Sequence, residues 1–219
     1  MPSVSEHDQS SSPRIDYVLS VASPWTYLGH ARFCRIARQF RATVRILPVD
    51  MVEVFARTGG TVFRNRAPER QSYRQIELER WSQALNIPLT LEPRYYPVAH
   101  EPASRLILAA SDMGYDALAL TGRLLAAIWL EERNIADKTT LHAIAAEGDV
   151  NTEALFRHAA SADVGKAYEA ATLEAVAKGA FGAPTYILGG ERFWGQDRLN
   201  FVEKSLLSMT EVSSTISSE

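Results

Sequence analysis

A short turn near the N-terminus constrains the fold of this chain more than any other segment. An apolar run from Ile15 to Val21 predicts a β-strand, and the stretch Pro24–Phe40 carries apolar residues at helical spacing. Ser23 lies between them, followed by proline, and these residue types favour the N-cap and the first position of a helix. The chain is therefore expected to begin with a strand that turns directly into a helix.

The hydroxyl of Ser23 lies at a place where a helix end favours negative charge. The first backbone N–H groups of a helix have no partner inside it, and the helix dipole makes this end positive. An anion or a thiolate is stabilised there. Ser23 is therefore the candidate for the reactive centre. The alternative is that Ser23 only caps the helix, which contributes about 1 kcal/mol.

A segment near the other end of the chain completes the pattern. Two β-rich runs flank Gly189-Gly190, a hairpin signal, and a helix is expected from Leu199 to Leu207. A further short strand is expected at Val44–Val49. The order is β-α-β at one end and β-β-α at the other, which predicts an α/β, thioredoxin-like fold. The two strands of the first unit are expected to be parallel and joined by a right-handed crossover.

The same signals divide the chain into regions. Residues 14–50 and 180–208 form the thioredoxin-like domain, and residues 51–179, which show helical patterns without a convincing strand, form an all-helical insertion. Residues 1–13 and 209–219 are rich in Ser or Thr and poor in apolar residues, so a disordered N-terminal tail and a flexible C-terminal tail are expected.

Two motifs resemble a known family. Ser23-Pro24-Trp25-Thr26 sits where DsbA-like oxidoreductases carry Cys-Pro-x-Cys, and Gly182-Ala183-Pro184-Thr185 matches their cis-proline loop. With serine at the first cysteine position and Phe193–Arg198 downstream, the chain most resembles the 2-hydroxychromene-2-carboxylate isomerases and the related kappa-class glutathione transferases. The resemblance runs from about residue 15 to residue 207. It implies a DsbA-like fold, glutathione as cofactor and a homodimer.

The resemblance also implies a glutathione site built from distant residues. Ser23 would donate a hydrogen bond to the glutathione sulfur, and the backbone around Ala183 and Pro184 would pair with the cysteinyl unit. Asp197 would bind the α-ammonium group of the γ-glutamyl end and Gln196 its carboxylate. The alternative for Asp197 is a helix cap.

Positive charge is concentrated between Arg64 and Arg74, a stretch that also contains Asn65. Asn65 approximately matches an asparagine of the isomerases that contacts glutathione. Arg70 and Arg74 are four residues apart and are expected on one helix face, which is either solvated and paired with acids or attracts an anionic substrate. The residues expected to bind substrate are Trp25, Arg70, Arg74 and Tyr95.

Composition narrows the possible chemistry. A hydrophobic content of 46% supports a full core, and a net charge of -3 gives no general attraction to nucleic acid or acidic membranes. The single cysteine, Cys34, lies among apolar residues and is expected to pack inside. Any thiol chemistry must then use a ligand's sulfur. The dispersed histidines predict no metal site, and the lack of a secretory signal or membrane span predicts a cytoplasmic protein.

The resemblance implies a glutathione-dependent isomerase of an aromatic or conjugated carboxylate. Two residues depart from the family pattern: Ser20 stands where the isomerases usually carry Asp, and Thr26 where Ser is usual. Two alternatives stay open. One is a kappa-like transferase that releases a glutathione conjugate, and the other is a redox-inactive DsbA-like module that binds a peptide or partner protein.

Overall fold

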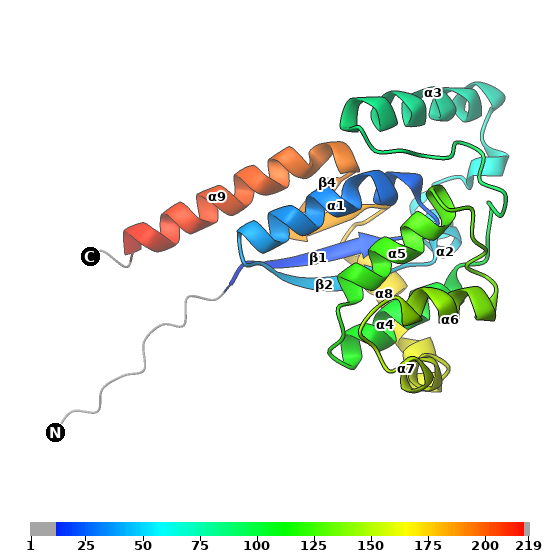
Figure 1. Ribbon diagram of the computed structural model, residues 1–219. Coiled ribbons are helices and arrows are strands. Elements are labelled where there is room, and N and C mark those ends of the chain that lie inside the picture. Colours follow the sequence, from blue (N-terminus) through cyan, green and yellow to red (C-terminus); the bar gives the residue numbers. More distant parts are fainter. Residues whose placement is uncertain (1–11, 217–219) are drawn as a thin grey trace.

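The computed structural model describes the backbone of residues 12–216 and the side chains as far as residue 210 (Figure 1). Its centre is a four-stranded sheet in the order β2-β1-β3-β4. The strands are β1 (Arg14–Leu19), β2 (Thr43–Pro48), β3 (Thr185–Leu188) and β4 (Glu191–Trp194). β1 is parallel to β2 and antiparallel to β3, and β3 is antiparallel to β4. The predicted α/β, thioredoxin-like fold is thus confirmed. Most of the predicted N-terminal tail lies outside the described residues.

The central strand β1 joins the two ends of the chain. Tyr17 is paired with Ile46 of β2 and with Tyr186 of β3, and the two tyrosine rings stack with their centroids 5.3 Å apart. Val18 is paired with Thr185, the first residue of β3. The turn that follows β1 therefore lies beside the loop that precedes β3.

Helices occupy the region where helical patterns were predicted, and capping side chains explain where most of them begin. Asp50, Asp116, Asp137, Asn151 and Ser161 each accept a hydrogen bond from the first turn of the helix that follows. A 3-10 turn, η1 (Phe63–Asn65), precedes α3. The helices before β3 are α1 (Pro24–Gln39), α2 (Met51–Thr58), α3 (Pro68–Leu85), α4 (Glu101–Asp112), α5 (Ala117–Trp129), α6 (Lys138–Ala146), α7 (Thr152–Ala159) and α8 (Ala162–Ala177).

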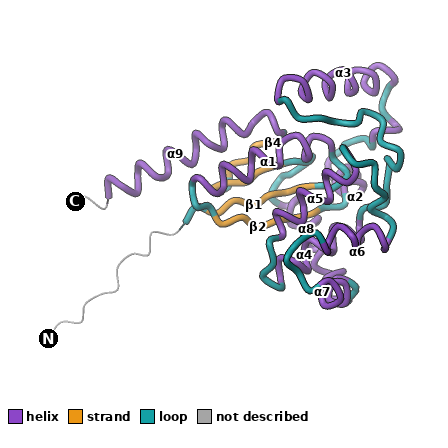
Figure 2. Tube along the Cα trace, viewed as in Figure 1, coloured by secondary structure: helices purple, strands orange, loops and turns teal. Residues whose placement is uncertain are grey.

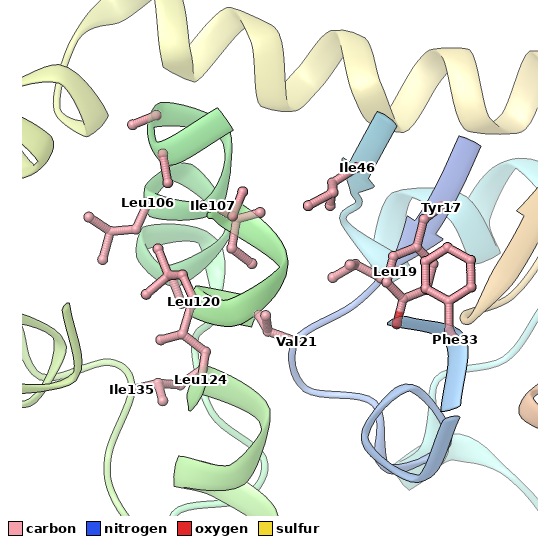
Figure 3. Close-up of a cluster of buried hydrophobic side chains, with 14 of the residues drawn as sticks. Tyr17, Leu19, Val21, Phe33, Ile46, Leu106, Ile107, Leu120, Leu124 and Ile135 are labelled. Atoms are coloured by element: carbon pink, nitrogen blue, oxygen red, sulfur yellow. The ribbon is translucent and has the colours of Figure 1, made fainter. Parts of the chain in front are cut away.

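Both faces of the sheet are apolar, and helices cover each of them (Figure 2). On one face, Tyr17 and Leu19 belong to a core cluster with Phe33 of α1 and with residues of α4 and α5 (Figure 3). On the other face, Val18 and Ile187 pack with residues of α2 and α8. The helical insertion therefore shares its core with the strands at both ends of the chain.

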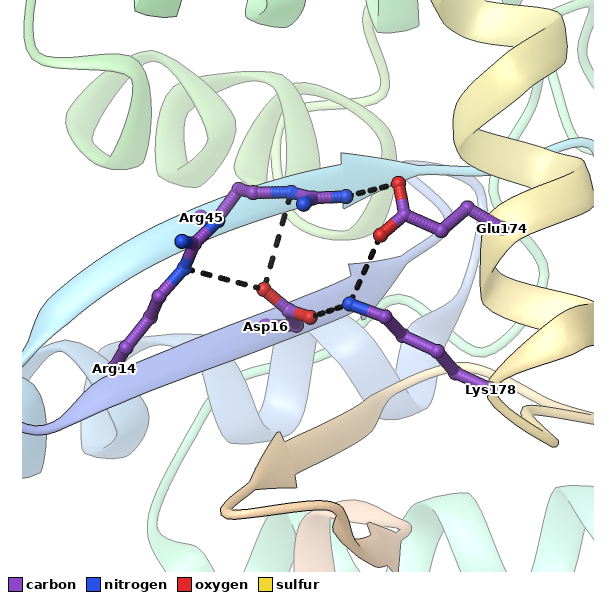
Figure 4. A network of polar contacts seen from close by, with 5 residues as sticks. All are labelled: Arg14, Asp16, Arg45, Glu174 and Lys178. Carbon is purple, nitrogen blue, oxygen red and sulfur yellow. Dashed lines mark hydrogen bonds and ion pairs between the residues drawn. The ribbon is translucent and has the colours of Figure 1, made fainter.

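Ion pairs fasten the end of α8 to the sheet (Figure 4). The carboxylate of Asp16, a β1 residue that is 7% exposed, pairs with Lys178 and lies 3.8 Å from the Nε atom of Arg45. Glu174 pairs with both Lys178 and Arg45, and these two contacts hold the pKa of Glu174 below its usual value. This network lies near the beginning of β1, whereas the Ser23 turn lies beyond its end.

Two helices lie at the margin of the molecule. Leu78 is the only fully buried residue of α3. The last helix, α9 (Leu199–Ile216), follows a second 3-10 turn, η2 (Gln196–Arg198), and projects from the body (Figure 1). It continues past its predicted end at Leu207, because no Gly or Pro interrupts it. Within the described residues, no helix is both long and apolar enough to cross a bilayer.

Candidate functional site

The hydroxyl of Ser23 connects the two motifs of the candidate site. Ser23 caps α1, and its Oγ accepts a hydrogen bond of 3.2 Å from the backbone N–H of Thr26. The same Oγ donates to the backbone carbonyl of Ala183 at 3.2 Å. Ser23 and Ala183 are 160 residues apart in sequence, so the fold brings together the turn and the loop that the sequence singled out.

The loop before β3 is held from both sides. The Ala183–Pro184 peptide bond is cis, as the resemblance implied. The Pro184 carbonyl accepts a hydrogen bond from the Gly195 N–H at 2.9 Å, and the Thr185 hydroxyl donates to the Gly182 carbonyl at 2.7 Å. These contacts fix the backbone of Ala183 against Ser23.

The first turn of α1 leaves one amide directed out of the helix end. Pro24 has no N–H, the Thr26 N–H is taken by the Ser23 side chain, and the Tyr27 N–H donates to the Ser23 carbonyl at 3.1 Å. The N–H of Trp25 therefore has no acceptor within the helix. A hydroxyl, a free amide and the positive end of a helix dipole meet here, which favours binding of an anion.

Gln196 and Asp197 lie next to the cis-proline loop, two residues or fewer from Gly195. Gln196 is 3% exposed and packs closely on Gly29 of α1, where a Cβ atom would come within 2.8 Å of the Gln196 Cβ. The half-exposed carboxylate of Asp197 pairs with Arg198. Among the described residues no backbone N–H donates to that carboxylate, so Asp197 does not act as a helix cap.

The charged segment around η1 and α3 lies apart from Ser23 in the hydrogen-bond pattern. Asn65 and Arg70 are exposed, and Tyr95 is 37% exposed. The guanidinium of Arg74 lies over the ring of Phe63 in η1 and over the ring of Tyr96 in the loop after α3. No hydrogen bond or ion pair within the described part of the chain joins these residues to Ser23 or to the cis-proline loop.

Cys34 lies about three turns along α1, where burial disfavours its thiolate form. Burial raises the pKa of its thiol to about 11. Its Sγ atom is 3.5 Å from the Nε2 atom of His30, which also lies 3.0 Å from the Leu118 carbonyl. Because a carbonyl only accepts, Nε2 carries the proton and Nδ1 accepts from the Tyr17 hydroxyl at 3.2 Å. Burial lowers the pKa of His30 to about 4, so its ring is neutral.

Sequence reasoning missed a pair of exposed aromatic residues at this site. The rings of Phe181 and Trp194 are 4.7 Å apart, and their side chains are 46% and 53% exposed. Both flank the cis-proline loop, one before it and one before Gly195. The alternation in β4 was the available signal, because Phe193 is buried on one face of the sheet and Trp194 therefore projects from the other.

Two surface hollows lie elsewhere. One of about 500 Å³ is lined by the Asp16 and Lys178 network, and one of about 710 Å³ by His30, Cys34 and neighbouring residues. Neither hollow includes Ser23 or the cis-proline loop. The second hollow contains the Cys34 thiol, whose thiolate form is disfavoured by burial. Among the described residues, no group of three or more His, Cys, Asp or Glu side chains is arranged to hold a metal ion.

Comparisons with known proteins agree with the fold. The family model for the DSBA-like thioredoxin domain matches residues 14–207. A 2-hydroxychromene-2-carboxylate isomerase from Pseudomonas putida is 27% identical over 207 residues, which cover 93% of this chain and 99% of the relative. The enzyme of the same name from Sphingobium xenophagum is 26% identical, over 88% of this chain and 97% of the relative. A solved 2-hydroxychromene-2-carboxylate isomerase superposes with a TM-score of 0.81 at 23% identity, over 93% of this chain and 98% of the other.

Proposed function

Because the chain belongs to the family of DsbA-like thioredoxin domains, and serine occupies the place of the family's reactive cysteine, we propose that it is a glutathione-dependent isomerase of an aromatic or conjugated carboxylate. The observation that supports this most is the contact between the Ser23 hydroxyl and the Ala183 carbonyl at the cis-proline loop. The names of the curated relatives favour isomerisation.

The sulfur in this proposal comes from the ligand. The chain's one cysteine has a raised pKa and is not hydrogen-bonded to Ser23 or the cis-proline loop. A free thiol has a pKa near 8.5, so lowering it by about two units makes the thiolate dominant at neutral pH and requires about 2.7 kcal/mol of preferential interaction. The Trp25 N–H, the helix dipole and the Ser23 hydroxyl supply interactions of this kind.

Ser23 has one proton to donate, and glutathione has to redirect it. Without ligand, the hydroxyl donates to the Ala183 carbonyl. In the complex it turns to the thiolate, while the Thr26 N–H still donates to its oxygen. The freed Ala183 carbonyl then accepts the amide N–H of the cysteinyl unit, so that one rotation serves both partners.

The reaction is a reversible addition. When bound, glutathione would supply a thiolate that adds to the conjugated carbon of the substrate and is released unchanged after isomerisation. In this proposal, Asp197 and Gln196 bind the γ-glutamyl end of glutathione. Asn65 of η1 contacts glutathione, and Arg70 of α3 binds the substrate. The homodimer and the cytoplasmic location stay predictions.

The test measures binding and thiol balance together. Calorimetry with reduced glutathione should show binding, and the S-methyl analogue should bind more weakly because it forms no thiolate. Turnover of 2-hydroxychromene-2-carboxylate should require catalytic glutathione, and the free thiol should be fully recovered. Stoichiometric thiol consumption would indicate the transferase instead. Failure of both binding and turnover would contradict the proposal.

A second candidate function, a redox-inactive binding module, is favoured by the exposed Phe181 and Trp194 rings beside the cis-proline loop. Such rings suit an extended apolar peptide that pairs with the exposed loop backbone. Binding of an unstructured apolar peptide by a chain that shows no affinity for glutathione would support this alternative.

A further inference from the structure

The guanidinium of Arg74 is half-buried in the η1 and α3 segment and stacks on aromatic rings. Its Cζ atom lies 4.3 Å from the ring centroid of Phe63 and 5.7 Å from that of Tyr96. Within the described residues it makes no ion pair and no side-chain hydrogen bond. Arg80, on the same helix, shows the ordinary arrangement, because it is exposed and pairs with Glu77.

An arginine in this environment lacks a counter-ion. Burial lowers the pKa of Arg74, and the nearby positive charge of Arg66 lowers it further. Arg66 does not pair with a carboxylate within the described residues. Its Nε atom donates to the Thr61 carbonyl at 2.9 Å, and its guanidinium lies 5.8 Å from the Phe55 ring centroid. Neither guanidinium pairs with a carboxylate within the described residues, so an anion bound beside them would be stabilised.

The stacking determines which atoms of Arg74 are available. Aromatic rings over the face of a guanidinium leave its N–H groups at the edge, where they match the two oxygens of a planar carboxylate. We propose that Arg74, held by Phe63 and Tyr96 and assisted by Arg66, binds the carboxylate group of the substrate. This proposal rests on the proposed function, because it assigns the acid group of the same aromatic substrate.

The surroundings of Arg74 favour the substrate over glutathione as the source of the carboxylate. The γ-glutamyl end of glutathione is assigned to η2 and its cysteinyl unit to the cis-proline loop, which meets α1 at Ser23. Figure 1 shows η1 and α3 on the side of the molecule where α1 begins. The aromatic walls of Phe63 and Tyr96 also suit a planar aromatic acid better than a flexible tripeptide.

The experiment compares a charged probe with a neutral analogue of the same shape. The affinities of 2-hydroxycinnamate and 2-hydroxycinnamamide are measured by calorimetry for the parent chain, Arg74→Gln, Arg74→Lys and the control Arg80→Gln. In Arg74→Gln, the carboxylate should bind about tenfold to hundredfold more weakly, with the amide unchanged. Arg74→Lys keeps the charge but lacks the fork, so about tenfold weakening is expected. Arg80→Gln should match the parent.

Three outcomes would overturn the assignment. They are unchanged affinity for the carboxylate in both Arg74 variants, an equal loss for the carboxylate and the amide, or a loss confined to reduced glutathione when it is titrated into the same proteins. Arg74→Lys keeps the test decisive if Arg74→Gln does not fold, because the lysine stem still covers the rings. Since no turnover is measured, the carboxylate site can stand even if the isomerase activity fails, and the reverse also holds.

Discussion

Ser23 and Cys34 lie on the same helix in opposite surroundings. Ser23 is half-buried at the positive end of α1, beside a free backbone amide and the cis-proline loop. Cys34 lies about three turns further on, against the neutral ring of His30, and burial raises its pKa to about 11. The serine, which has no sulfur, thus occupies the place where a thiolate is stabilised, and the cysteine occupies a place where a thiolate is disfavoured.

The difference teaches that position along the helix decides the chemistry more than residue type does. At the N-terminus, unpaired N–H groups and the dipole favour an anion. In the middle, the N–H groups are used within the helix and only desolvation remains. The N-terminal end of α1 should therefore affect glutathione chemistry, and its later turns should affect stability alone.

The largest effect that we expect belongs to His30, which lies in the later turns of α1. Its pKa of about 4 in the folded chain lies below the unfolded value of 6.5, so the unfolded chain binds more protons between these values. The free energy of unfolding should therefore fall by about 3 kcal/mol as the pH drops from 6.5 to 4. Chemical denaturation of the parent and of His30→Gln at several pH values would measure the difference.

Comparison of these two proteins isolates the contribution of His30. His30→Gln should lose about one proton from the slope of the parent. Equal slopes for the parent and His30→Gln would show that His30 titrates normally in the folded chain.

The next largest effect concerns Ser23 at the N-terminal end of α1. Ser23→Ala removes the hydrogen bond to the thiolate, which is worth about 1.5–3 kcal/mol, so turnover should fall about tenfold to hundredfold with the fold retained. The ultraviolet absorbance of bound thiolate, titrated in both proteins, should show a raised thiol pKa in the variant. An unchanged thiol pKa would remove Ser23 from the mechanism.

Local signals in the sequence were sufficient for the elements that form this site. The strand before Ser23, the proline after it and the Gly189-Gly190 hairpin each carry a short-range rule, and together they predicted the fold and the meeting of Ser23 with Ala183. The helical insertion was predicted from apolar residues at helical spacing and from the lack of a convincing strand between residues 51 and 179.

Contacts between distant segments could not be predicted in this way. The stacking of Arg74 on Tyr96 depends on the path of the loop after α3, and the sequence showed only a run of positive charge. The pairing of Phe181 with Trp194 depends on which face of β4 is buried. The length of α9 was underestimated because a polar composition was taken as a sign of disorder, although nothing in it breaks a helix.

A smaller effect is expected at Asp197, which separates recognition of the γ-glutamyl end from the chemistry at Ser23. Asp197→Asn removes the charge and keeps the size, so glutathione should bind about tenfold more weakly, because a charge-assisted contact becomes neutral. The pairing with Arg198 limits the loss by competing for the same carboxylate. Calorimetry should show this change with little change in melting temperature. Equal affinity would assign Asp197 to its pair with Arg198 and strengthen the binding-module alternative.

The smallest effect on activity should come from Cys34→Ser, which tests the other side of the comparison. The thiol is uncharged at neutral pH and contacts His30 rather than Ser23, so turnover with glutathione should stay within about threefold of the parent. A more polar hydroxyl in this half-buried place costs at most about 1–3 kcal/mol of stability, so activity is measured on the folded fraction. Complete loss of turnover in well-folded protein would mean that Cys34 supplies the reactive sulfur. The contrast between the N-terminal end of α1 and its later turns would then be wrong.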